Sequence, residues 1–120
     1  MVGLHEGIGT LVVIAFLALT VVYILQLRGK RIEWSRQLSM AAGGLLLLQY
    51  ALGFILIGGD NDVSPFHFLF ALGTIATVGL EHAMGRGEGG GSPNLRMAAA
   101  GAAGTTALAL IAYAIGQSTA

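Results

Sequence analysis

Four long apolar stretches alternate with three short polar connections along this chain. The stretches cover about residues 4–27, 37–57, 65–84 and 96–116. A helix of about 20 residues, rising ~1.5 Å per residue, crosses the ~30 Å hydrocarbon core of a bilayer. Backbone polar groups must be paired inside lipid, so we expect each stretch to be helical. The pattern predicts an all-α, integral membrane four-helix bundle that forms a single domain over residues 1–120.

The charged residues predict how the bundle is oriented. All six Lys and Arg residues fall in the first and third connections or directly beside them: Arg28, Lys30, Arg31, Arg36, Arg86 and Arg96. Cationic connections tend to stay in the cytoplasm. We therefore expect the N and C termini outside, together with the middle connection and its acidic run Asp60-Asn61-Asp62. The expected location is a prokaryotic cytoplasmic (inner) membrane, which the chain crosses several times.

Composition supports the membrane assignment and argues against several classes of protein. Hydrophobic residues make up 55% of the chain and charged residues 10%, and the mean hydropathy is +0.78; a water-soluble domain does not have this composition. The formal net charge is zero, so nothing indicates nucleic acid as a partner. The sequence has no cysteine, which excludes zinc–thiolate sites, iron–sulfur clusters and c-type haem attachment. No basic residue precedes the first apolar stretch, so we expect residues 4–27 to be a retained helix rather than a signal peptide.

One glycine-rich segment matches a nucleotide-binding fingerprint by its letters alone. Residues 85–90 read G-x-G-x-x-G. That fingerprint requires a preceding strand and a following helix in a βαβ unit, whereas this segment lies between two membrane spans. We interpret residues 85–95 as a flexible loop.

The last apolar stretch is rich in Ala, Gly and Thr. Ala100 with Gly104, and Gly101 with Thr105, have the spacing of neighbours on a helix face. Small residues permit close helix contact in lipid, where packing replaces the hydrophobic effect. We expect this helix to press against a neighbour, either inside the bundle or in another subunit, including a second copy of the chain.

Two histidines are the strongest candidates for chemistry, because ionisable residues inside membranes are costly. His5 begins the first predicted helix and His67 the third, so alternating topology puts both at one membrane face. First and third helices of a bundle can face one another across the core, where cofactors bind. A haem held by two imidazoles needs one ligand on each side of the ring. Counted from the basic connections at ~1.5 Å per residue, the two histidines differ in height by ~6 Å.

Neighbouring residues suit a cofactor between these helices. Gly9 and Ala71 stand four residues after His5 and His67, on the same faces, and would leave room for a macrocycle. Gln49, near the middle of the second helix, needs a hydrogen-bond partner. It either bonds a neighbouring helix or lines a cofactor pocket.

The other ionisable residues are interpreted as boundary residues. His82 has no second histidine at its end of the bundle and is expected among the lipid headgroups. Glu6 and Glu81 are expected at the interfaces, where either could assist proton transfer. The same interfacial interpretation is the alternative for His5 and His67.

Three segments of the chain resemble one half of the haem A synthase family. They are Leu4–Gly9, Leu48–Gly53 and Pro65–Leu72. Proteins of that family are membrane bundles of two similar four-helix halves. Each half has a pair of histidines near the outer surface and a glutamine–leucine–glycine helix between them. The resemblance covers about residues 4–84 and implies that His5 and His67 are axial haem ligands, with Gln49 in the helix beside the haem.

The chain also departs from that family. A glutamate three residues before the first histidine is tied to oxidation of the haem methyl group in the family; here that position is Val2. An arginine usually follows the histidine, whereas this chain has Glu6. Only one half is present. The resemblance therefore implies haem binding with the synthase chemistry lost.

Two functions are consistent with these observations. In the first, a small integral membrane protein binds haem b through His5 and His67 near the outer face, and transfers electrons or carries the cofactor within a membrane complex. In the second, the chain is a non-catalytic accessory subunit of a respiratory or photosynthetic complex and has no cofactor of its own. Val2 argues against an enzyme, and the lack of a mid-membrane acidic residue argues against a transporter. Expected partners are the lipid bilayer, other membrane-protein subunits or a second copy.

Overall fold

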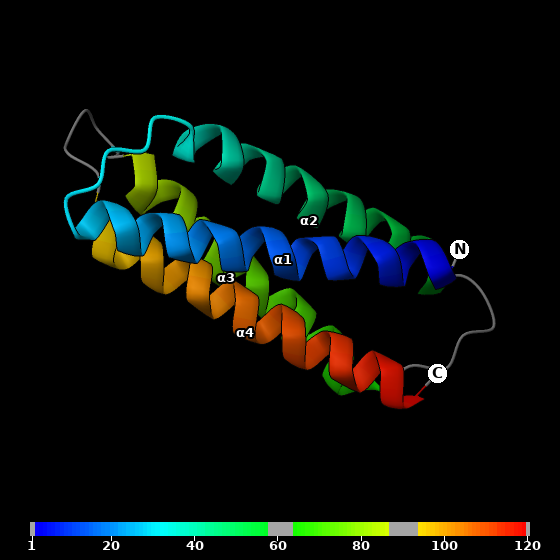
Figure 1. The fold of residues 1–120 in the computed structure, drawn as a ribbon. Coiled ribbons are helices and arrows are strands. Elements are labelled where there is room, and N and C mark those ends of the chain that lie inside the picture. The colour runs from blue at the N-terminus through cyan, green and yellow to red at the C-terminus, as the bar shows by residue number, and fades with distance from the viewer. Residues whose placement is uncertain (1, 58–63, 87–93, 120) are drawn as a thin grey trace.

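The computed structural model describes residues 2–57, 64–86 and 94–119, and these residues form four helices (Figure 1). They are α1 (Val2–Leu27), α2 (Ser35–Ile57), α3 (Pro65–Arg86) and α4 (Leu95–Thr119). Within those residues there is no strand, so the all-α prediction is confirmed. All four helices are long and apolar enough to cross a membrane. The helices continue past the ends of the apolar stretches, as α4 does to Thr119. Helical hydrogen bonding does not stop where the apolar side chains stop.

Local capping explains where several helices begin and end. The Ser64 hydroxyl accepts a hydrogen bond from Phe66 N at 3.2 Å, as Ser64-Pro65 predicts for a helix start. Asn94 plays the same part for α4, accepting from Met97 N at 3.1 Å. α1 ends at Leu27 and is capped by Gly29, whose φ of 90° is open only to glycine at low cost. Lys30 N then bonds Leu25 O at 3.0 Å, which closes a Schellman cap.

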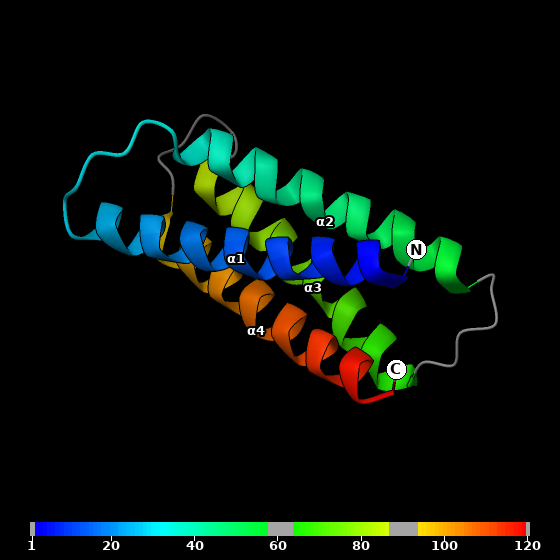
Figure 2. The same cartoon turned by 45° about the vertical axis from the view of Figure 1, so that its right-hand side comes forward.

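The helices pack in pairs that meet at one end of the molecule. α1 lies against α2 and α4, and α3 lies against α4, while α2 and α3 touch far less. In the ribbons, α1 with α2 and α3 with α4 form two pairs that spread away from each other toward the end that holds both chain termini (Figures 1 and 2). We call that end the termini end, and the opposite one, where α1 connects to α2, the basic end. The acidic run 60–62 and residues 87–90 lie outside the described residues.

The glycine-rich segment begins inside a helix, not in a loop. Gly85 and Arg86 are the last two residues of α3, so the expectation that the loop starts at Gly85 is wrong. The element before the glycines is a helix, which is not the strand that a dinucleotide fingerprint requires.

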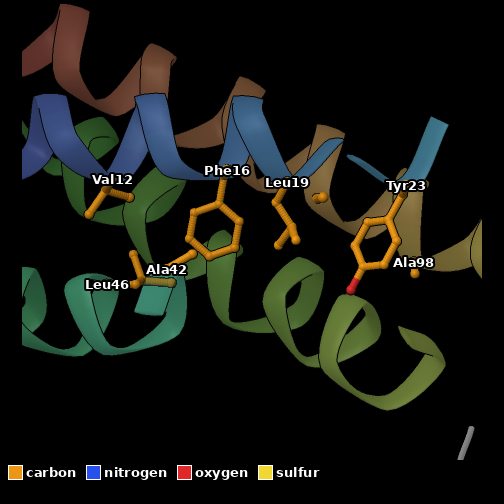
Figure 3. Packing of buried hydrophobic residues seen from close by; sticks show 8 residues of the cluster. Val12, Phe16, Leu19, Tyr23, Ala42, Leu46 and Ala98 are labelled. Atoms are coloured by element: carbon orange, nitrogen blue, oxygen red, sulfur yellow. The ribbon is translucent and has the colours of Figure 1, made fainter. Parts of the chain in front are cut away.

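One face of α1 supplies most of the large core side chains. Val12, Phe16, Leu19 and Tyr23 recur every three to four residues, and all are buried (Figure 3). They pack mainly against small or branched residues of α2 and α4, namely Ala42, Leu46, Ala98 and Ala102. The Tyr23 hydroxyl points to the last turns of α3.

The small residues of α4 bring its backbone against α3. A Cβ placed on Gly101 would lie 2.7 Å from both Glu81 N and Thr77 O. The Thr105 hydroxyl, one turn on, donates to Thr77 Oγ1 at 2.7 Å. Gly101 and Thr105 thus make the predicted close contact inside the bundle, whereas Ala100 is exposed.

Candidate functional site

The structure brings His5 and His67 together at the termini end. Their ring centroids are 6.3 Å apart, and the ring planes are inclined at 71°. When two imidazoles bind the same metal ion from opposite sides, each at about 2.0 Å, their ring centroids are about 6 Å apart. The difference in height expected from counting residues does not separate the rings, because the helices are inclined to one another (Figure 2).

The His67 ring is oriented by α4. Its Nδ1 lies 2.6 Å from Ala112 O. Since a carbonyl oxygen can only accept, Nδ1 carries the hydrogen, and the lone pair is on Nε2. A Cβ on Gly116 would lie 3.2 Å from His67 Nδ1, so the ring can lie here because residue 116 has no side chain. A backbone carbonyl that fixes the tautomer in this way is typical of histidines that bind metals.

The His5 ring has weaker partners. Gln49 Nε2 lies 3.5 Å from His5 Nε2, at the outer limit for a hydrogen bond. His5 Nδ1 and Gln49 Oε1 are buried and have no hydrogen-bond partner among the described residues. Cε1 of the ring, which is bonded to Nε2, also lies against α2, 3.4 Å from where a Cβ on Gly53 would be. Buried polar atoms without partners are costly and call for an explanation.

Gly9 and Ala71 do lie beside side chains from α2. A Cβ on Gly9 would be 2.9 Å from Gln49 Nε2. The Ala71 carbonyl accepts the hydroxyl of Tyr50 at 3.1 Å, and Tyr50 also bonds Thr74. The space next to these two small residues is therefore shared with Gln49 and Tyr50.

A second polar cluster lies at the basic end and was not predicted. Glu81 is fully buried, so the expectation that it is an interface residue is wrong. Its Oε1 accepts the hydroxyls of Tyr23 at 2.5 Å and Ser39 at 2.8 Å. His82 Nδ1 forms an ion-pair contact with Glu81 Oε2, and the His82 side chain is 27% exposed.

The sequence did contain a signal for this cluster. Glu81 follows His67 by 14 residues, close to four helical turns, so both lie on the α3 face that points into the bundle. The position of Glu81 along the chain indicates its depth, near the end of a span, but not whether its side chain points into the bundle. Contacts from all four helices bury it.

A cavity of about 220 Å³ adjoins the cluster. It is lined by Tyr23, Ser35, Arg36, Ser39 and Gly85. Tyr23 and Ser39 therefore contact both the cavity and the buried carboxylate.

Comparison of the chain with protein families, with curated proteins and with solved structures found no match. Among the described residues no group of three or more His, Asp or Glu could hold a metal ion. The histidine pair at the termini end thus offers two protein ligands, a number that fits a porphyrin-bound metal and not a tetrahedral zinc site.

Proposed function

We propose that this chain is a haem b-binding membrane protein in which His5 and His67 are the two axial ligands. The observation that carries the proposal is the 6.3 Å separation of their ring centroids, on α1 and α3, at one end of the bundle. The chain has no cysteine for the covalent attachment of a c-type haem, so the cofactor proposed is a non-covalently bound haem b. When bound, haem with both axial positions filled supplies one-electron transfer.

The chain's own residues fit this cofactor in three ways. Ala112 O fixes the His67 tautomer that leaves Nε2 for the metal. His5 has a buried ring nitrogen without a partner, so ligation would remove an unfavourable feature of the structure. Gly9 and Ala71 place no large side chain of their own beside the pair, and the side chains next to them are those of Gln49 and Tyr50.

The proposed role is electron transfer, or carriage of the haem within a larger membrane complex, with partners bound in the bilayer. Haem modification is not part of the proposal, since Val2 stands where the resembling family has its glutamate. The proposed location is a prokaryotic inner membrane with the haem near the outer face, following the cation distribution.

The test is a spectrum of the whole chain. The protein is produced in a haem-synthesising bacterial host, purified in mild detergent, and scanned before and after dithionite. The expected result is a reduced-minus-oxidised difference spectrum of a low-spin haem b, lost in both His5→Ala and His67→Ala. His82→Ala, at the opposite end, is the matched control and is expected to keep the full spectrum.

Helicity measured by circular dichroism separates loss of ligand from loss of fold. A wild-type protein that takes up no haem, or a spectrum unchanged in both histidine variants, overturns the ligand assignment. A colourless protein that co-purifies with a larger respiratory or photosynthetic complex would instead favour the accessory-subunit function.

A further inference from the structure

The basic end holds an ionisable group in an unusual place for a membrane bundle. Glu81 has no exposed surface and is contacted by all four helices. α1 contributes Tyr23, α2 contributes Ser39, and His82 follows in α3. From α4, Gly101 brings its backbone against Glu81 N and Cα. Acidic residues at such positions are rare and mark ion or proton pathways.

The two carboxylate oxygens have different partners. Oε1 accepts two hydroxyls, from Tyr23 and Ser39. Oε2 faces His82 Nδ1 in an ion-pair contact, and neither atom has another hydrogen-bond partner among the described residues. The His82 ring is seated by a glycine of α2, since a Cβ on Gly43 would lie 2.8 Å from His82 Nε2.

The hydroxyls of Tyr23 and Ser39 also connect the Glu81 carboxylate to the neighbouring cavity. Tyr23 and Ser39 line the cavity of about 220 Å³ together with Ser35, Arg36 and Gly85. Water occupies about 30 Å³ per molecule in the liquid, so a polar cavity of this size holds several waters. A hydroxyl can accept a proton from water and pass its own proton to Glu81 Oε1.

We infer that Glu81 and His82 form a proton-binding site that exchanges with the basic end of the bundle through this cavity. The resting pair holds one proton between His82 Nδ1 and Glu81 Oε2. A second proton from cavity water reaches Oε1 through Ser39 or Tyr23 and converts the carboxylate to a carboxyl group. Release follows the same route in reverse. The site does not depend on the histidine pair at the termini end.

The charged and titratable neighbours are consistent with a proton as the ligand. Around Glu81 they are His82 in α3 and Tyr23 in α1, and Arg36 in α2 lines the adjoining cavity. Arg36, an exposed residue that lines the cavity, brings a positive charge that disfavours a metal cation there, whereas it does not hinder water-mediated proton exchange. Gly101, the α4 residue in contact, has no side chain.

Infrared spectroscopy of the full chain in phosphatidylcholine vesicles tests the site. On acidification, wild type is expected to gain a carbonyl band from a protonated carboxyl group, and Glu81→Gln is expected to lack that band. Glu6→Gln, which removes the half-exposed glutamate at the other end, is the matched control and keeps it. After a pH jump, the double variant Ser39→Ala/Tyr23→Phe is expected to gain the band about tenfold or more slowly than wild type.

Each other outcome overturns the inference. Identical difference spectra for wild type and Glu81→Gln mean that Glu81 stays in one protonation state and acts only as a hydrogen-bond acceptor. Suppression of the band by Zn²⁺ alone means that the cluster is a cation site. Equal rates in the double variant and wild type mean that protons do not travel by the cavity.

Discussion

At the residue scale, glycine positions decide where the imidazole rings lie. Each histidine ring lies close to the place that the Cβ of a larger residue would take on a neighbouring helix: His5 at Gly53, His67 at Gly116 and His82 at Gly43. Absence of a Cβ lets a ring lie within van der Waals distance of that helix. Such pairs are formed by residues far apart in the sequence, so no local motif reveals them.

Tyr23→Phe tests the hydroxyl contact at Glu81. The change keeps the buried ring but leaves Oε1 with the Ser39 donor alone. Because a buried carboxylate loses a hydrogen bond, we expect the free energy of unfolding to fall by about 1–3 kcal/mol. Tyr113→Phe is the control, since its hydroxyl has no hydrogen bond among the described residues. The measurement is reversible unfolding by SDS in mixed micelles; equal effects of the two changes would contradict the contact.

At the element scale, α4 is shaped by its closest approach to α3. Gly101 and Thr105 lie on the α3 side, and the two hydroxyls of Thr105 and Thr77 bond across the interface at 2.7 Å. Gly104 also faces Thr77, 3.0 Å from where a Cβ would be. Small residues and short hydroxyl side chains are the contacts that hold helices together in lipid. This face is therefore engaged within the bundle.

Gly101→Ala is expected to weaken this helix pair. The added methyl group would meet backbone atoms of Thr77 and Glu81 at 2.7 Å, and backbone cannot move aside as a flexible side chain can. Overpacking of this kind costs about 1–3 kcal/mol of unfolding free energy. Gly79→Ala, on the exposed face of α3 with nothing within 4 Å, is the control. It is expected to leave stability unchanged or raise it by up to about 1 kcal/mol, because alanine favours helix. A Gly101→Ala protein as stable as the control would show that the helices are not this close.

At the scale of the whole molecule, the two polar sites stand at opposite ends of one bundle. At the basic end, contacts from all four helices bury Glu81. At the termini end, where the pair α1 and α2 spreads away from the pair α3 and α4, the two histidines stay partly exposed (Figure 2). All six Lys and Arg residues lie in the connections of the basic end or in the turns beside them. This charge asymmetry predicts that the basic end faces the cytoplasm.

Single cysteines test this orientation cleanly, because the natural chain has none. Gly3→Cys, exposed at the termini end, is expected to react with a membrane-impermeant maleimide in intact cells. Glu33→Cys, exposed in the first connection, is expected to react only after the cells are permeabilised. Labelling is read as a mass shift of the purified protein. The reverse pattern would place the histidine pair on the cytoplasmic side.

Hydropathy and capping residues predicted much of the fold. Inside lipid, a backbone N–H or C=O group without a hydrogen bond costs roughly several kcal/mol of free energy. An apolar stretch of this length therefore has little alternative to a helix. Ser64-Pro65 has the residue types of a helix start, and Asn94 and Gly29 also cap helices in the structure. The pairing of His5 with His67 followed from alternating topology and is present in the structure. Haem binding by that pair stays a prediction.

The sequence by itself determined four helices, their lengths and which polar residues share an end, because each of these follows from distance along the chain and from the exclusion of bare backbone from lipid. Tertiary structure alone decided which way each polar side chain faces. Glu81 has the same depth whether it points to lipid or to Tyr23 and Ser39. Only the inclination of the helices, set by glycine contacts such as that of Gly101 with α3, places it in the interior.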